Sequence, residues 1–218
     1  MLRTVTIVPT ILAGDKQSFR DQIERYNSFT RRIQIDVTDG IFAPQTTLDI
    51  TNVWWPKTWE TDLHFMSAKP SNDLDTILKL QPSLCILHAE AEEDLLPIFA
   101  KLKEHDIKVG VALMKQTYPG RVKEYIEAAD HALVFAGEIG KQGSPADMMQ
   151  TEKISLIRNM KPEIEIGWDG GANLNNVRAL AHSDLDVINV GSALSKAENP
   201  AGVYQTLVAE IDKNGVVI

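Results

Sequence analysis

Eight short runs of apolar and β-branched residues recur along the 218-residue chain, and segments with the spacing of amphipathic helices separate them. Most of the runs are apolar throughout, which is typical of strands that a parallel sheet buries on both faces. Several runs end in a polar side chain, and a barrel gathers such residues at one face. These observations predict an α/β fold, a single (β/α)8 barrel (TIM barrel) domain covering residues 1–218.

The elements are expected in strict alternation along the chain. The strands are expected at residues 5–12, 32–37, 61–66, 83–89, 107–114, 131–137, 163–168 and 185–191. The clearest helices are expected at residues 15–29, 72–81, 91–105, 146–160 and 199–213. Asp15 and Asn72 are expected as helix N-caps, and Pro200 suits a first helical turn. The segment 46–59 contains Pro56 and is expected to form a short, irregular crossover.

The main alternative is an open, doubly wound sheet. That fold would need a different number of strands and a glycine-rich fingerprint for a nucleotide. The sequence contains no G-x-G-x-x-G motif, so the barrel is preferred.

The composition argues against several classes of function. The net charge is −8, from 22 basic and 30 acidic residues, which argues against nucleic acid and anionic membranes as partners. No apolar stretch is long enough to cross a bilayer, and the first residues lack the pattern of a secretory signal, so a cytoplasmic location is expected. The single cysteine, Cys85, lies in the apolar run SLCIL and is expected to be a buried core residue.

Three polar residues end expected strands: Asp36 in RIQID, His64 in TDLH and Asp169 in IEIGWD. The carboxyl ends of parallel strands meet at the top of a barrel, so these side chains are expected to converge. Two carboxylates and an imidazole at one point could bind a divalent metal, move protons, or do both. Taken alone, each residue has a simpler interpretation, such as a turn cap or a core histidine.

Two glycine-containing turns, DGGAN at 169–173 and VGSALS at 190–195, follow the last two expected strands. Glycine lets the backbone approach a ligand closely, and a helix that starts after such a turn points free amides at an anion. The loops after strands seven and eight are a frequent phosphate site in barrels. The candidates for binding the phosphate of a substrate are Gly170, Gly171, Gly191 and Ser192.

Six segments of the chain carry a family resemblance. They read VPTILAGD, QIDVTDGIFAPQ, DLHFM, HAE, WDGG and NVGSA, and they begin at residues 8, 34, 62, 88, 168 and 189. In order and spacing they are similar to A-P-S-I-L-A-A-D, H-I-D-V-M-D-G-x-F-V-P-N, D-V-H-L-M, H-A-E, V-D-G-G and V-x-G-S-A. These are patterns of the ribulose-phosphate 3-epimerase family, which the chain therefore resembles nearly from end to end.

The resemblance implies an isomerase that interconverts D-ribulose 5-phosphate and D-xylulose 5-phosphate, or that acts on a related ketose phosphate. Asp36 and Asp169 match the two carboxylates that remove and return the C3 proton through an enediolate. The same aspartates and His64 match ligands of a divalent metal, for which zinc, iron, manganese and cobalt are candidates. Met66 matches a methionine that shields the enediolate. The family also implies a homo-oligomer, although nothing in the sequence fixes its size.

The departures from the family pattern cluster where substrate and metal would lie. Gln34 stands in place of the family's other histidine ligand, and an amide oxygen is a weaker donor than imidazole for zinc or iron. Thr10 replaces a serine but keeps a hydroxyl. The loop 135–143 is about two residues shorter than the glycine-rich loop of the family, with Gly140 and Gln142 as the retained residues. This clustering suggests an altered chemistry or substrate.

Two other functions compete with the epimerase. A metal-independent or inactive relative that binds a phosphorylated ligand is favoured by Gln34 and the short loop, and disfavoured by the two retained aspartates. The related decarboxylase and aldolase-like synthase barrels need a D-x-K-x-x-D pattern on the third strand, which reads DLHFMSAKP here. They are therefore ranked low.

Structural roles are expected for the other histidines and for the tryptophans. His88 ends the fourth expected strand and is assigned a structural role, while Glu90 acts on the site through other residues at most. Surface positions are expected for His105, His131 and His182. Packing of the irregular crossover, or a subunit contact, is expected for Trp54, Trp55 and Trp59.

Overall fold

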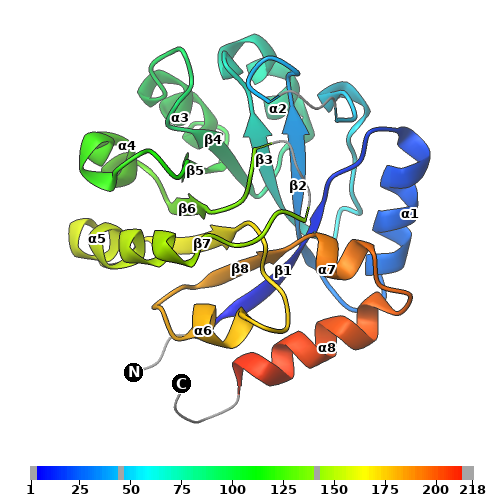
Figure 1. Ribbon diagram of the computed structural model, residues 1–218. Helices are drawn as coiled ribbons and strands as arrows, with labels where there is room; N and C mark the ends of the chain where they lie inside the picture. The colour runs from blue at the N-terminus through cyan, green and yellow to red at the C-terminus, as the bar shows by residue number, and fades with distance from the viewer. Residues whose placement is uncertain (1–3, 44–46, 140–142, 213–218) are drawn as a thin grey trace.

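Eight parallel strands close into a barrel in the order of the sequence, β1 to β8 (Figure 1). This computed structural model describes residues 4–43, 47–139 and 143–212. The strands are β1 (Thr6–Ile11), β2 (Arg32–Thr38), β3 (Glu60–Met66), β4 (Leu84–His88), β5 (Lys108–Leu113), β6 (His131–Phe135), β7 (Glu165–Asp169) and β8 (Val187–Val190). Pairing of β1 with β8 closes the sheet. The predicted (β/α)8 barrel is therefore confirmed, and the open-sheet alternative is wrong.

Helices form the outer layer and surround the barrel in Figure 1. The α-helices are α1 (Lys16–Tyr26), α2 (Leu74–Leu80), α3 (Leu96–Lys103), α4 (Lys123–Ala128), α5 (Glu152–Met160), α6 (Val177–Ala181), α7 (Ser192–Ser195) and α8 (Pro200–Ile211). Short 3₁₀ turns are η1 (Ile50–Asn52), η2 (Pro70–Asp73), η3 (Pro119–Arg121) and η4 (Met148–Thr151). In the described part of the crossover between β2 and β3, η1 is the only helical element, as the sequence predicts.

The two predicted helix caps have different outcomes. The Asp15 side chain accepts hydrogen bonds from the N–H groups of Gln17 and Ser18, so this cap is confirmed. The prediction for Asn72 is wrong, because Asn72 lies inside η2 and its own N–H donates to the carbonyl of Lys69. A proline at the start of η2 begins a tight turn two residues before Asn72, so the helix that follows starts without a side-chain cap.

Apolar side chains pack on both surfaces of the sheet. The larger cluster lies between the sheet and the helices, and it contains Cys85, which is fully buried. Burial raises the pKa of this thiol to about 12, which agrees with the predicted core role. A smaller cluster fills the barrel interior with Leu84, Ile86, Ala112 and Leu133.

A cluster of charged side chains lies where the barrel strands begin, which we call the lower end of the barrel. Arg32 donates from Nε to Asp62 at 2.9 Å and from both terminal nitrogens to Glu165 at 2.9 and 2.8 Å. The ring of His131 joins the cluster, with Nδ1 2.8 Å from Glu165 Oε2. The predicted surface position of His131 is therefore wrong: it is 1% exposed, because it starts β6 facing the interior, where Gly167 leaves room for the ring.

The other aromatic predictions agree with the structure. His105 and His182 are exposed. Trp59 is buried and Trp55 packs against the core, whereas Trp54 is 43% exposed and meets Phe19 edge-on.

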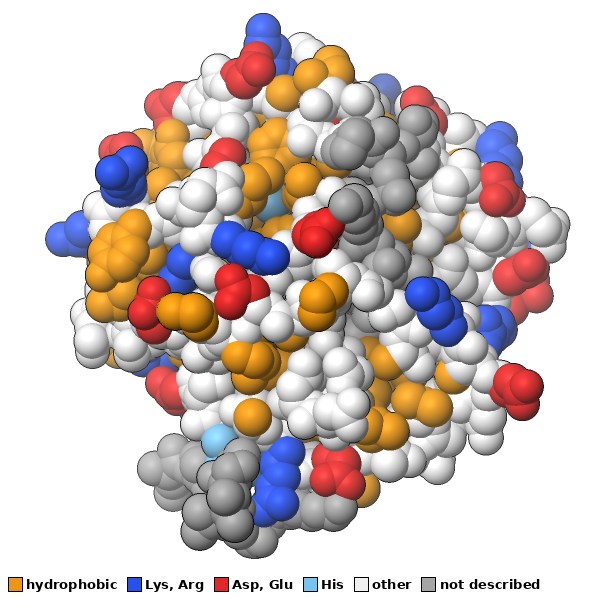
Figure 2. All heavy atoms as spheres, in the orientation of Figure 1, with side chains coloured by type: hydrophobic (Ala, Val, Ile, Leu, Met, Phe, Trp, Pro, Cys, Tyr) orange, Lys and Arg blue, Asp and Glu red, His pale blue; other side chains and the backbone are white. Residues whose placement is uncertain are grey.

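No helix among the described residues is long and apolar enough to cross a membrane. On the face drawn in Figure 2, acidic and basic side chains are interspersed rather than gathered by sign.

Candidate active site

Asp36, His64 and Asp169 converge towards the C-terminal ends of the strands, which we call the upper end of the barrel. Their ligating atoms all lie within 4.8 Å of one another. The register of β2 and β3 places Asp36 beside His64, whose Nδ1 is 3.0 Å from Asp36 Oδ1. The same nitrogen is 3.7 Å from Oδ2 of Asp169, which ends β7. The structure thus brings together the three residues that the strand ends predicted.

Gln34 lies two residues before Asp36 on β2 and is fully buried beneath the carboxylates. Its Nε2 donates to Asp36 Oδ1 at 2.9 Å and to Asp169 Oδ2 at 2.6 Å. Its Oε1 is buried and has no partner among the described residues. The amide that replaces the family's histidine therefore bridges the two carboxylates through its nitrogen.

Burial and the neighbouring charge of Asp36 raise the pKa of the Asp169 carboxyl to about 7. Burial alone would lower the pKa of His64, but its hydrogen bond to Asp36 and the charges of both aspartates outweigh that effect and raise it.

A second histidine lies directly behind His64. His64 Nε2 and His88 Nε2 are 2.8 Å apart, and His88 Nδ1 is 3.2 Å from Glu90 Oε2. Glu90 Oε1 accepts a hydrogen bond from the N–H of Met114 at 2.9 Å, which links the loop after β5 to the same series of side-chain contacts. The H-A-E segment was the available signal for this connection, but the sequence does not reveal that His88 reaches His64.

The donor set fits a divalent metal. Catalytic zinc is held by three protein ligands beside an open position, imidazole and carboxylate both bind it, and the same donors also suit iron and manganese. Gln34 fits as a fourth ligand only if its amide turns over, because its nitrogen now faces the carboxylates. The turned amide would place Oε1 against two carboxylates, and that arrangement requires a cation between them.

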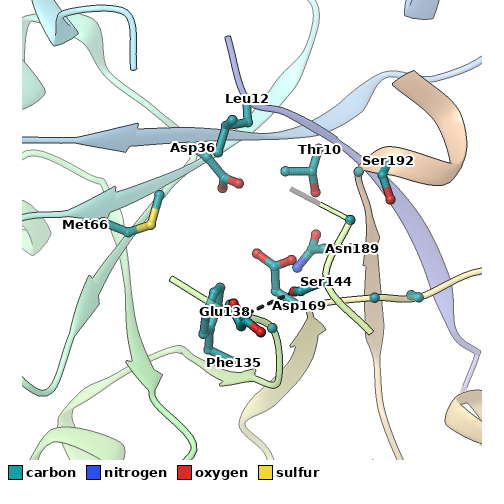
Figure 3. A pocket seen from close by; sticks show the side chains of 16 residues that line it. Thr10, Leu12, Asp36, Met66, Phe135, Glu138, Ser144, Asp169, Asn189 and Ser192 are labelled. Atoms are coloured by element: carbon teal, nitrogen blue, oxygen red, sulfur yellow. Dashed lines mark hydrogen bonds between the residues drawn. The ribbon is translucent and has the colours of Figure 1, made fainter. Parts of the chain in front are cut away.

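The pocket opens directly above these residues. Figure 3 shows the carboxylates of Asp36 and Asp169 pointing toward one another across it. Thr10 and Met66, both predicted from sequence, line it as well. Sequence reasoning missed Asn189, which lines the pocket from β8 with a buried Oδ1 that has no partner among the described residues. Its position two residues before Gly191, on the same side of the strand, was the signal that could have found it.

The glycines of the predicted phosphate turns line the same pocket, as does Ser192. Gly170 and Gly171 have φ angles of +120° and +67°. A Cβ on Gly170 would lie 2.1 Å from the Gly137 nitrogen, and one on Gly171 would lie 2.2 Å from the Ala146 nitrogen. The backbone of this turn therefore requires glycine for local packing, whatever ligand it binds.

The loop after β6 forms another wall of the pocket. Glu138 and Ser144 line it, and the Glu138 N–H donates to Ser144 Oγ at 2.9 Å (Figure 3). The predicted substrate residues Gly140 and Gln142 lie outside the described residues.

Solved structures confirm the architecture. A 3-hexulose-6-phosphate synthase superposes with a TM-score of 0.72 at 15% identity, covering 95% of this chain and all of that one. A Mycobacterium tuberculosis tryptophan synthase chain gives a TM-score of 0.72 at 13% identity, covering 97% of this chain and 94% of that one. At these identities the likeness concerns the fold alone.

Sequence comparison is more specific. A ribulose-phosphate 3-epimerase of Schizosaccharomyces pombe is 28% identical, with 92% of this chain and 91% of the relative covered. The Helicobacter pylori enzyme of the same name is 24% identical over 88% of this chain and 92% of its own. The family model described as "Ribulose-phosphate 3 epimerase family" matches residues 6–195. Because that match spans nearly the whole barrel, with the converging aspartates inside it, this chain belongs to the ribulose-phosphate 3-epimerase family.

Proposed function

We propose that this protein epimerises C3 of a ketose phosphate, interconverting D-ribulose 5-phosphate and D-xylulose 5-phosphate or a related pair. Family membership and the names of the relatives support an epimerase acting on a sugar phosphate. The observation that carries the proposal is the meeting of Asp36 and Asp169 over one pocket, although β1 and β8 separate their strands.

In this mechanism one aspartate removes the C3 proton and the other returns a proton to the opposite face. Because Asp36 and Asp169 reach the pocket from different strands, a substrate seated between them presents one face to each carboxylate. Proton transfer by a positioned side chain accelerates such steps by about 10²–10⁴-fold. Met66 and Phe135 contribute apolar walls that keep water from the enediolate.

We assign Asp36, His64 and Asp169 as the ligands of a divalent metal, with Gln34 as a conditional fourth. When bound, the metal would polarise the C2 carbonyl and stabilise the negative charge that develops on its oxygen. Contacts with His64 and Gln34 position the two carboxylates before a metal binds.

We assign the phosphate of the substrate to the backbone of Gly170, Gly171, Gly191 and Ser192, with Thr10 beside them. Four of the five are small residues whose backbone a phosphate can approach, and all five line the pocket. The Lys196 ammonium adds positive charge near Ser192. Both side chains lie next to Gly143, close to the position that a Cβ would occupy there. Gly140 and Gln142 stay predicted contacts.

Solvent deuterium at C3 tests the proposal. D-ribulose 5-phosphate is incubated in D₂O with Zn²⁺, Mn²⁺ or Fe²⁺ and followed by NMR, beside Asp169→Asn and a control, Asp75→Asn on the surface of α2. We expect incorporation by the wild type and by Asp75→Asn, and none by Asp169→Asn. Absence of incorporation with every metal would overturn the pentulose-phosphate assignment.

A metal-independent relative is the second candidate, and one observation favours it. The Gln34 amide directs its nitrogen, which is a donor and not a metal ligand, at both carboxylates. Exchange at C3 that persists after exhaustive chelation would establish this alternative, and exchange that chelation abolishes would reject it. The homo-oligomeric state and the cytoplasmic location stay predictions, which light scattering and cell fractionation would check.

A further inference from the structure

His64 and His88 form the buried middle of a chain of contacts that runs from Asp36 to Glu90. Both rings are fully buried, and Phe135 packs against each of them with ring centroids 5.9 and 5.8 Å away. Each of the four ring nitrogens faces a protein atom, at 3.0, 2.8 and 3.2 Å along the chain. Because the rings are shielded from solvent, the protons on these nitrogens must satisfy all three contacts together.

Counting protons limits the possible arrangements. The contact between the rings needs a proton, because two bare nitrogens 2.8 Å apart would set lone pair against lone pair, which is strongly unfavourable. If His64 Nε2 carries that proton, His88 Nε2 accepts it and the proton of the His88 ring lies on Nδ1, towards Glu90. If His88 Nε2 carries it, His64 Nε2 accepts it and the proton of the His64 ring lies on Nδ1.

The surroundings of His88 Nδ1 and His64 Nδ1 decide between these two arrangements. At the Glu90 end, the carboxylate oxygen Oε2 faces His88 Nδ1, which is fully buried and has no access for a cation. Glu90 Oε1 is already an acceptor for Met114 N–H, and the buried Lys153 ammonium binds the Met114 carbonyl nearby, so an ionised Glu90 is favoured. At the other end, His64 Nδ1 faces Asp36 and Asp169, which both line the pocket.

We propose that Glu90, acting through His88, fixes the tautomer of His64 so that its Nδ1 lone pair is directed at the metal position. His88 donates from Nδ1 to Glu90, and His64 donates from Nε2 to His88. His64 Nδ1 is then left facing the carboxylates of Asp36 and Asp169, where the metal would be held. Glu90 is a positioning residue, and this role rests on the metal ligands assigned above.

Replacing the Glu90 carboxylate by an amide should reverse the direction of the hydrogen bond between His64 and His88. In Glu90→Gln the amide N–H can donate to His88 Nδ1, so His88 would donate from Nε2 to His64 and leave a proton on His64 Nδ1. That proton blocks the metal-binding nitrogen. Outer-shell partners of metal-bound histidines typically contribute about 10- to 100-fold in metal affinity, and we expect a loss of that size for Zn²⁺.

The first readout is the tautomer of His88 in the metal-free protein, measured by long-range ¹H–¹⁵N NMR on histidine-labelled samples. We expect the Nδ1–H tautomer in the wild type and the Nε2–H tautomer in Glu90→Gln. Glu92→Gln, which removes the same charge two residues along the same loop, should behave as the wild type in this measurement. The second readout is Zn²⁺ affinity by competition with a chromophoric chelator.

An Nε2–H tautomer of His88 in the wild type would overturn the inference, as would a Zn²⁺ affinity that Glu90→Gln does not lower. If Glu90→Gln fails to fold, the wild-type spectrum alone decides, and Glu90→Asp supplies the retained carboxylate. The NMR result does not depend on turnover. A protein without epimerase activity could still show the expected tautomers, and an active epimerase could show the opposite ones.

Discussion

The barrel carries a cluster of ionisable side chains at each end, and the same three strands supply most of both. Strands β2, β3 and β7 contribute Arg32, Asp62 and Glu165 at the lower end and Asp36, His64 and Asp169 at the upper end. The lower cluster contains its own permanent cation, bonded to both carboxylates. The upper cluster has two carboxylates that share an imidazole and a neutral amide.

This difference separates a structural ion cluster from a reactive one. At the lower end, Arg32 makes a two-pronged contact with Glu165, and such geometry fixes charges without leaving any to react. At the upper end, neutralising the negative charge of the two carboxylates depends on protons or on an added cation. The upper cluster is therefore the one that can exchange protons with a substrate, and four experiments test the contrast.

The largest expected effect is on catalysis at the upper end. Asp36→Asn should slow deuterium exchange at C3 of D-ribulose 5-phosphate by about 10²–10⁴-fold, because one of the two proton carriers is lost. Glu165→Gln, a matched change on the lower cluster, should leave exchange per folded molecule unchanged. Equal losses in both variants would remove the functional distinction between the two ends.

The next effect is on stability at the lower end. Arg32→Met should lower the free energy of unfolding by about 3–5 kcal/mol, because it leaves the buried Asp62 carboxylate without its cation. Urea denaturation followed by circular dichroism measures this loss. Adding Asp62→Leu should recover part of it. A loss below about 1 kcal/mol would mean that the cluster behaves as an exposed ion pair.

A smaller effect is expected on metal affinity. Gln34→His should tighten Zn²⁺ binding on the order of tenfold, or about 1.4 kcal/mol, because imidazole is a better donor than an amide oxygen. Competition with a chelator, with Asp75→Asn as the control, measures the change. Unaltered affinity would mean that position 34 does not contact the metal and that three ligands complete the protein's contribution.

The smallest effect concerns pH. Burial alone would raise the pKa of Glu165, but hydrogen bonds from Arg32 and His131 outweigh it and hold the pKa well below its usual range. A carboxyl whose pKa is lowered by folding stabilises the protein above its unfolded pKa of about 4.3, and this contribution is lost as pH falls.

The wild type should therefore lose stability more steeply than Glu165→Gln between about pH 5 and pH 3. Burial and the neighbouring charge of Glu165 raise the pKa of Asp62, which works in the opposite direction and does so less in Glu165→Gln. Parallel pH profiles of the urea midpoint would contradict the assigned role of Glu165.

The sequence was sufficient to predict the barrel because its strands are buried on both faces and therefore read as continuous apolar runs. It also predicted which strand ends would meet, since Asp36, His64 and Asp169 each end a run. What it could not supply was hydrogen-bond direction. That Gln34 would use its nitrogen to bridge two carboxylates depends on β2 and β7, which are not neighbours in the sheet, approaching one another in space.

Side-chain direction at the start of a strand was equally hard to predict. His131 precedes an apolar run by one position, which is compatible with either the surface or the barrel interior. The structure decides this through Gly167 on the neighbouring strand, whose missing side chain provides the space for the ring. Pairwise complementarity of this kind between distant residues leaves no periodic signal in a single sequence.

Cys85 has a practical consequence for following the molecule in solution. Its thiol is buried in the wall of the barrel, and burial raises its pKa, so it should not react with maleimides while the fold is intact. A cysteine introduced at an exposed position would then be the one reactive thiol. A fluorophore could be attached there without first removing a native residue.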